Sequence, residues 1–178
     1  MPDIATHYAF GLLAASRVER SWVKAALLAL VALTPDIDVL LRIHRWFTHS
    51  FAIAFTIFGV VTLTLLYVGR EGLLRYVAVA ALLYVLHIAL DTFTAPTPVL
   101  WPLTNQAYML NAELNGVVAE DGVRIAPTIS VSSKAADFTQ QPLIEGPIIS
   151  PQGIITAIGV ATILLVEWFV RRQRYERG

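Results

Sequence analysis

The heptapeptide HRWFTHS, His44–Ser50, places two histidines and an arginine in seven residues of a very apolar chain. Asp36 and Asp38 precede it in the motif PDID, and His87 and Asp91 follow it, four residues apart. Residues four apart share one face of a helix, so His87 and Asp91 can present two ligands to one metal ion. Imidazole and carboxylate groups together suit zinc, manganese or iron. These residues therefore indicate a divalent metal site.

The elements that must position these residues are apolar segments long enough to lie in a membrane. Of the 178 residues, 56% are hydrophobic and only 15% are charged, whereas soluble domains carry about 25% charged residues. A spanning helix needs about 20 apolar residues, and this requirement indicates segments at 22–41, 51–68, 73–90 and 154–170, with a shorter one at 4–15. The sequence predicts a mainly α fold, a polytopic helical bundle with four or five embedded helices in one membrane domain over 1–178.

The region 105–147 differs in character from the apolar segments. Polar and apolar residues alternate in places in VVAEDGVRIAPTISVSS, and EDG is typical of a hairpin turn. We expect a small β-rich insertion outside the membrane. The arginine-rich end RRQRYERG places the C-terminus in the cytoplasm by the positive-inside rule. The insertion is then extracytoplasmic, and the protein is a multi-pass protein of the inner (plasma) membrane.

The depth of each polar residue follows from its distance along the chain from the inner end of its helix, at a rise of about 1.5 Å per residue. On this count every histidine of the chain lies at a similar depth, in the outer part of the membrane. The polar set at this depth is His7, Asp36, Asp38, His44, His49, His87 and Asp91. Each ionisable residue at such depth costs about 2.5–3.5 kcal/mol on insertion scales, so a shared functional site is the better explanation. The expected metal ligands are His7, Asp36, Asp38, His49, His87 and Asp91. We expect one or two ions, zinc first and then manganese or iron, since a pair suits phosphoester chemistry.

Other residues of the set and its neighbours have candidate roles in catalysis and substrate binding. One of Asp36, Asp38 or His44 is the candidate general acid or base. Arg42 and Arg45 are candidates for holding an anionic substrate, since guanidinium pairs well with phosphate. An alternative for Arg45 is an interfacial anchor, a role that also fits Trp46. The predicted catalytic residues are Asp36, His44 and Arg45, and the predicted substrate-binding residues are Arg42, Arg45 and Trp46.

Four blocks of the sequence also resemble a known family. THYAFG, PDID, HRWFTHS and HIALDTFT, followed by LWPL, occur in order between Thr6 and Pro102. They are similar to the YdjM-like family of membrane-bound metal-dependent hydrolases. The resemblance implies that the seven histidines and aspartates form the polar core, and a distant likeness to zinc-dependent phospholipases C and zinc nucleases implies phosphoester hydrolysis. This chain departs from the family pattern at Trp46 and at APTP, where family members often have glycine, and both changes affect the predicted mouth of the site.

Three functions compete at this level. The first is an integral-membrane hydrolase that cleaves a phosphoester or lipid at the outer membrane face. The second is a membrane scaffold or regulatory protein with a structural metal site, and the third is a proton or metal transporter. A pathway through the membrane needs polar groups at every depth, and the inner halves of these segments have almost none. The expected partners are membrane lipids, and the zero formal net charge gives no indication of nucleic-acid binding.

Overall fold

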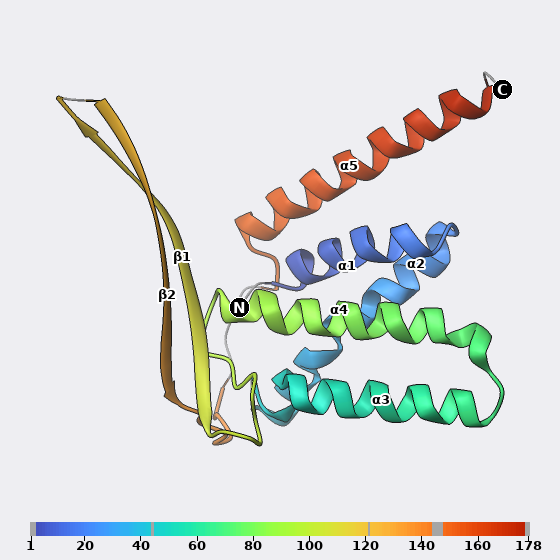
Figure 1. Ribbon diagram of the computed structural model, residues 1–178, viewed down its shortest axis with the longest axis horizontal. Helices are drawn as coiled ribbons and strands as arrows, with labels where there is room; N and C mark the ends of the chain where they lie inside the picture. Colours follow the sequence, from blue (N-terminus) through green and yellow to red (C-terminus); the bar gives the residue numbers. More distant parts are fainter. Residues whose placement is uncertain (1–2, 44, 121, 144–147, 177–178) are drawn as a thin grey trace.

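A computed structural model describes residues 3–43, 45–120, 122–143 and 148–176. Its elements in chain order are α1 (Ile4–Val18), α2 (Trp22–Ala29), the 3₁₀ segments η1 (Leu30–Leu41) and η2 (Phe47–His49), α3 (Phe51–Tyr67), the 3₁₀ turn η3 (Glu71–Leu73), α4 (Leu74–Thr92), β1 (Gln106–Ala119), β2 (Gly122–Ala135) and α5 (Pro151–Glu176). Helices α1, α3 and α4 run side by side, whereas α5 diverges from them toward the C-terminus (Figure 1).

The expected bundle of four or five embedded helices is wrong for the described part of the chain. Only two described stretches are long and apolar enough to cross a membrane, Glu71–Thr92 and Pro151–Val170. The 15 residues of α1 extend about 22 Å, short of the roughly 30 Å of a bilayer's hydrocarbon core. The expected helix at 22–41 is instead an eight-residue α2 followed by η1, which contains Pro35. Proline has no N–H group to continue an α-helical hydrogen-bond ladder.

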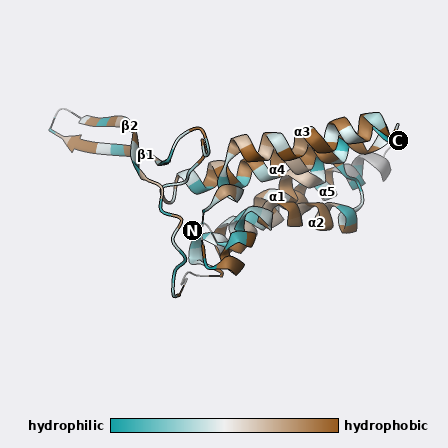
Figure 2. Ribbon diagram, turned by 90° about the horizontal axis from the view of Figure 1, so that it is seen from below, coloured by the Kyte–Doolittle hydropathy of each residue, from teal (hydrophilic) through white to brown (hydrophobic). Residues whose placement is uncertain are grey.

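Small residues mediate several of the helix contacts, as is common where helices associate in membranes. Ala15 packs with Ala25 and Ala29 between α1 and α2, and Ala9 packs with Val160 and Leu164 between α1 and α5. Many large apolar side chains on α3 and α5 are instead exposed, and Figure 2 shows these helices as largely hydrophobic. Their exposed apolar surface is suited to contact with lipid.

The predicted β insertion contains a two-stranded antiparallel sheet, β1 paired with β2 from Gln106↔Ala135 to Ala119↔Gly122. Its base is joined to the helical part by a bridge between Thr97 and Tyr108. We expected the insertion to lie over the mouth of the site. Only the base of the hairpin lies there, and the rest extends across and beyond the ends of the helices (Figure 1).

A candidate metal centre

Helix α4 carries two of the site residues near its C-terminal end. His87 and Asp91 are each 1% exposed, and they face the same side of α4 because they are one turn apart. The Nδ1 atom of His87 lies 2.7 Å from the carbonyl oxygen of Ala32 in η1. With Nδ1–H donating to that carbonyl, the Nε2 atom of His87 is the one directed toward the cluster.

Two 3₁₀ segments supply the other residues. Asp36 lies in η1, and its Oδ1 atom is 3.5 Å from the Nε2 atoms of both His49 and His87. His49 ends η2, directly before Ser50, whose side chain caps α3 by accepting from the N–H of Ile53. The Nε2 atom of His49 is 3.3 Å from Asp91 Oδ2. The capped N-terminus of α3 therefore fixes the position of His49, which directly precedes the capping residue.

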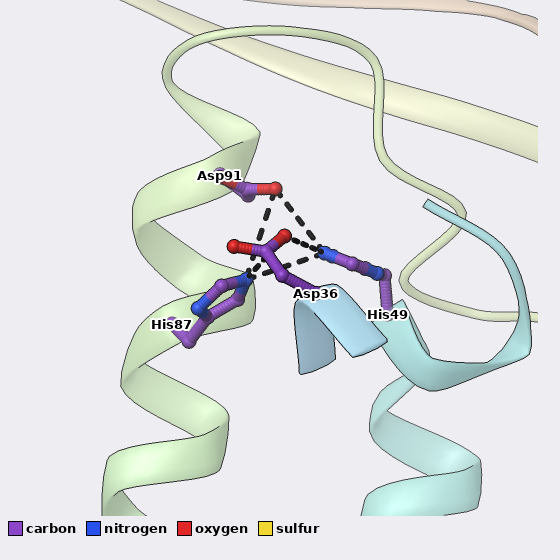
Figure 3. A group of neighbouring side chains, drawn as sticks. All are labelled: Asp36, His49, His87 and Asp91. Atoms are coloured by element: carbon purple, nitrogen blue, oxygen red, sulfur yellow. Dashed lines mark hydrogen bonds and ion pairs between the residues drawn. The ribbon is translucent and has the colours of Figure 1, made fainter. Parts of the chain in front are cut away.

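Asp36, His49, His87 and Asp91 form a group that could hold a metal ion, called the metal cluster below. One potential ligand atom from each lies within 4.8 Å of the others, and the four side chains converge on a common point (Figure 3). The two Nε2 atoms are only 3.2 Å apart. Two imidazoles and two carboxylates at this separation are a donor set suited to zinc, manganese or iron. Three of the four are fully buried, and Asp36, with 16% of its side chain exposed, is the most open.

His7, from α1, lies beside this cluster. Its ring stacks on that of His87 with centroids 3.8 Å apart, and its Nε2 atom is 3.4 Å from Asp91 Oδ1. Both ring nitrogens of His7 and the Oδ1 atom of Asp91 are nonetheless buried without a hydrogen-bond partner among the described residues. Unpaired buried polar atoms are costly, and a cation bound between His7 Nε2 and Asp91 Oδ1 would satisfy these two atoms. The site therefore fits a metal ion.

Asp38 lies on the far side of His49 from the cluster. Its Oδ2 atom accepts from the N–H of Trp46 and the hydroxyl of Thr48, both at 2.8 Å, and lies 3.2 Å from His49 Nδ1. Carboxylates in this position hold the tautomer and orientation of metal-binding histidines. The structure thus separates the two aspartates of PDID: it places Asp36 in the metal cluster and Asp38 behind one of its histidines.

Charge is concentrated around His49. Burial alone would lower the pKa of its imidazole, but hydrogen bonding to Asp36, Asp38 and Asp91 raises that pKa to about 10. A proton and a divalent cation would compete for the Nε2 atom of this imidazole, so metal binding here would be coupled to proton release.

Arg45 contacts the cluster directly. Its side chain is 8% exposed, and its Nε atom donates to Asp91 Oδ2 at 2.8 Å while Nη2 donates to the Thr94 hydroxyl at 3.0 Å. Its backbone φ of 60° is left-handed, an uncommon conformation for a non-glycine residue that is often associated with functional sites. Arg45 also lines a cavity of about 250 Å³ at the base of the hairpin, together with Lys134 and Asp137.

The remaining predicted residues are not part of the cluster of four. Arg42 is exposed, also has a left-handed φ of 57°, and accepts a hydrogen bond from Gln141 N–H at its carbonyl. Trp46 packs edge-on against Phe47. His44 lies outside the described residues.

Two supporting groups were not predicted from the sequence. The Tyr84 hydroxyl donates to the Thr48 carbonyl at 2.6 Å. Tyr84 precedes His87 by one turn on the same face of α4, which is the signal that could have identified it. The second group is the backbone carbonyl of Ala32, which anchors His87. Because every residue has such a carbonyl, the residue type at position 32 could not have identified it.

Comparison with known proteins gave one match. A family model described as YdjM inner membrane protein matches residues 1–173, which extends the resemblance from Thr6–Pro102 to nearly the whole chain. No curated protein and no solved structure matches the chain.

Proposed function

Because the chain belongs to the YdjM family of inner membrane proteins, we propose that it is a membrane-bound, metal-dependent hydrolase acting on a phosphoester, with a phospholipid as the expected substrate class. The cluster of Asp36, His49, His87 and Asp91 is the observation that carries the proposal. Zinc is the expected metal, since tetrahedral sites of nitrogen and oxygen ligands suit it.

The residues of the cluster have distinct expected roles. His49 and His87 would bind the ion through Nε2, and Asp36 and Asp91 through carboxylate oxygens. Once bound, a divalent cation supplies Lewis acidity toward a phosphoryl oxygen and makes water a better nucleophile near neutral pH. Asp36 is the most open of the four, which favours it as the group that accepts the proton when water attacks phosphorus and the ester P–O bond breaks.

The cavity beside Arg45 supports an anionic substrate. Arg45 is bound to Asp91 through Nε and lines the same cavity as Lys134, so two cationic residues line a cavity that adjoins the cluster through Arg45. Guanidinium and ammonium groups both bind phosphate. Asp137 also lines the cavity, and its carboxylate would repel a second negative charge on the substrate. A phosphodiester, with one negative charge, fits this arrangement better than a monoester.

A second candidate is a structural metal site in a non-enzymatic membrane protein. The near-complete burial of His49, His87 and Asp91 favours it, since structural sites are closed and catalytic sites keep an open position. Activity and stability separate the two candidates: loss of a structural ion unfolds the protein, whereas loss of a catalytic ion removes hydrolysis from a protein that remains folded.

The test uses purified protein in detergent, with metal content measured by mass spectrometry and hydrolysis measured on a chromogenic phosphodiester and on phospholipid. We expect His87→Ala and Asp91→Asn to lose both metal and hydrolysis. The matched control is Asp137→Asn, which removes an exposed carboxylate outside the cluster and should keep the metal. Full metal with no hydrolysis of any phosphodiester or phospholipid by the unmodified protein would reject the hydrolase. Absence of metal from every preparation, even after reconstitution with zinc, manganese or iron, would reject the metal site.

A further inference from the structure

The strand register divides the hairpin into two chemically different faces. Directly paired residues of an antiparallel ladder lie on the same face, and successive residues alternate between faces. The pairs Leu110↔Val131, Leu114↔Pro127 and Val118↔Val123 therefore place even positions 110–118 of β1 with odd positions 123–131 of β2. We call this set the apolar face of the hairpin, because all ten of its residues are apolar or glycine.

The opposite face is polar over most of its length. It contains Asn111 paired with Ser130, Glu113 paired with Thr128, and Arg124 paired with Val117. Within the paired strand positions from 110 to 131, the two charged residues are Glu113 and Arg124, and both lie on this face. A hairpin immersed in water on both sides has no need of such a division.

The apolar face is uncovered within the described part of the chain. Leu114 is 73% exposed, Val118 is 82% exposed and Ile129 is 73% exposed, and the sheet has only two strands. An isolated two-stranded hairpin is marginally stable in water, and a continuous exposed apolar surface of this kind marks an interaction site. No described residue covers this face, so we look for its partner outside the described part of the chain.

The base of the hairpin connects the apolar face to the core between the helices. Tyr108 is at an even position of β1, on the same face as Leu110, and it packs against the core formed by Ala54 of α3 and Tyr84 and Ile88 of α4. The apolar face thus begins as a continuation of the helix core. The lower part of the hairpin runs across the ends of α3 and α4 (Figure 1), and its tip projects beyond the helices (Figure 2).

We propose that the apolar face of the hairpin rests on the lipid surface beside the helices, with its side chains among the outer acyl chains and its polar face in water. Helix α4 belongs to one of the two candidate spans. If α4 crosses a bilayer, the surface of that bilayer lies near the end of α4, where the hairpin passes. The segregation of Glu113 and Arg124 onto the other face matches the boundary between hydrocarbon and water. This inference does not depend on hydrolase activity.

The experiment places an environment-sensitive fluorophore on single cysteines, which is direct because the chain has none. Leu114→Cys and Ile129→Cys report on the apolar face, and their chain neighbours Asn115→Cys and Thr128→Cys are matched controls on the polar face. The full-length protein is reconstituted in nanodiscs of phosphatidylethanolamine and phosphatidylglycerol at one copy per disc. Quenching is measured with lipids brominated on the acyl chains and with aqueous iodide.

We expect blue-shifted emission and quenching by brominated chains at positions 114 and 129, and quenching by iodide at positions 115 and 128. Equal responses on the two faces would overturn the proposal. Emission at position 114 that becomes blue-shifted only when discs hold two copies would also overturn it, and would assign the face to a second copy of the chain. Two reporters on separate strands guard against a variant that disturbs the hairpin locally.

Discussion

The two histidines of the metal cluster are oriented by different kinds of partner. His87 is held by a backbone carbonyl, that of Ala32, whereas His49 lies against the carboxylate of Asp38. A carbonyl cannot be removed by substitution, but a carboxylate can. Asp38 is therefore the position at which support of a ligand can be tested separately from the ligand itself.

Asp38→Asn should weaken metal binding without abolishing it. The amide keeps an oxygen for Trp46 N–H and the Thr48 hydroxyl but loses the negative charge beside His49, and such outer partners contribute about 10–100-fold in metal affinity. Competition with a fluorescent chelator measures the change. Affinity equal to that of the unmodified protein would show that Asp38 has no influence on the ligand.

Arg45→Ala should keep the metal and weaken substrate binding by about 1.5–3 kcal/mol, the value of a hydrogen bond to a charged group. Its Nε atom contacts Asp91 Oδ2, the oxygen that also lies 3.3 Å from His49 Nε2, and removal of the guanidinium leaves both oxygens of that carboxylate in place. Metal content and KM are measured on the same preparation. Loss of metal comparable to that in Asp91→Asn would instead make Arg45 a support for the ligand.

Sequence reasoning identified the site residues best where local geometry decides the outcome. One helical turn places His87 and Asp91 on one face of α4 in any tertiary arrangement. The separate roles of Asp36 and Asp38 were not predictable, because they depend on the 3₁₀ geometry of η1 and on where His49 meets it. The contact of Arg45 with Asp91 depends on a left-handed backbone at position 45, for which the sequence gives no signal.

At the scale of elements, α1 is held between two neighbours by contacts of different kinds. Toward η1 and α2 the contact is steric: a Cβ atom at Gly11 would lie 2.9 Å from Ala32 Cβ and 3.0 Å from the Ala29 carbonyl. Toward α5 the contact includes polar groups, since Asp3 accepts from Ser150 N–H and Arg17 Nη1 is 2.6 Å from Glu167 Oε2. Because His7 lies on α1, these contacts also set its distance from His87.

Gly11→Ala should destabilise the protein by about 1–3 kcal/mol, the usual cost of overpacking, because neither a backbone carbonyl nor a short alanine can move aside easily. Gly59→Ala is the matched control, since nothing lies within 4 Å of a Cβ there and alanine favours a helix. Thermal unfolding in detergent compares them. A midpoint unchanged in Gly11→Ala would contradict close packing of α1 on η1.

Ionisation of Asp3 should make the stability of the protein depend on pH in the acid range. Burial alone would raise its pKa, but hydrogen bonds from Ser150 and Thr6 lower it below the usual value. A carboxyl with a lowered folded-state pKa stabilises the fold above its unfolded pKa of about 3.9, and this contribution is lost as pH falls through the folded value. Asp3→Ala, which also removes the N-cap of α1, should cost about 0.5–2 kcal/mol at neutral pH.

The control for this prediction is Asp3→Asn, which keeps a capping oxygen but cannot ionise. Unfolding midpoints of the three proteins are measured from neutral pH to below pH 4. The difference between the unmodified protein and Asp3→Asn should shrink in acid. A constant difference across this range would show that ionisation of Asp3 does not contribute.

The number of embedded helices was mispredicted because hydropathy indicates apolar surface and does not indicate helix length. The segment at 22–41 is apolar throughout its first part, yet its α-helix ends at Ala29. The β hairpin was predicted better, because its alternation and turn are local features. Its direction across the helix ends depends on the packing of Tyr108 and has no local signal.

At the scale of the whole molecule, α5 separates the hairpin from the C-terminal arginines. If α5 crosses the membrane once, positions 120 and 173 lie on opposite faces, with the hairpin outside. Labelling of Glu120→Cys and Gln173→Cys with a membrane-impermeant maleimide in intact and permeabilised cells tests this. Position 120 should react in intact cells and position 173 only after permeabilisation. The reverse pattern would reverse the orientation and place the metal cluster at the cytoplasmic face.

The order of the site residues along the chain has a consequence for biosynthesis. All four residues of the metal cluster lie between positions 36 and 91, so the ribosome has made them, and α1 with His7, before it begins the hairpin or α5. A nascent chain with α4 in place then has every ligand, whereas its last candidate span is not yet synthesised. We expect metal capture to precede the docking of α5, and metal supply during translation to influence whether the new protein matures or is degraded.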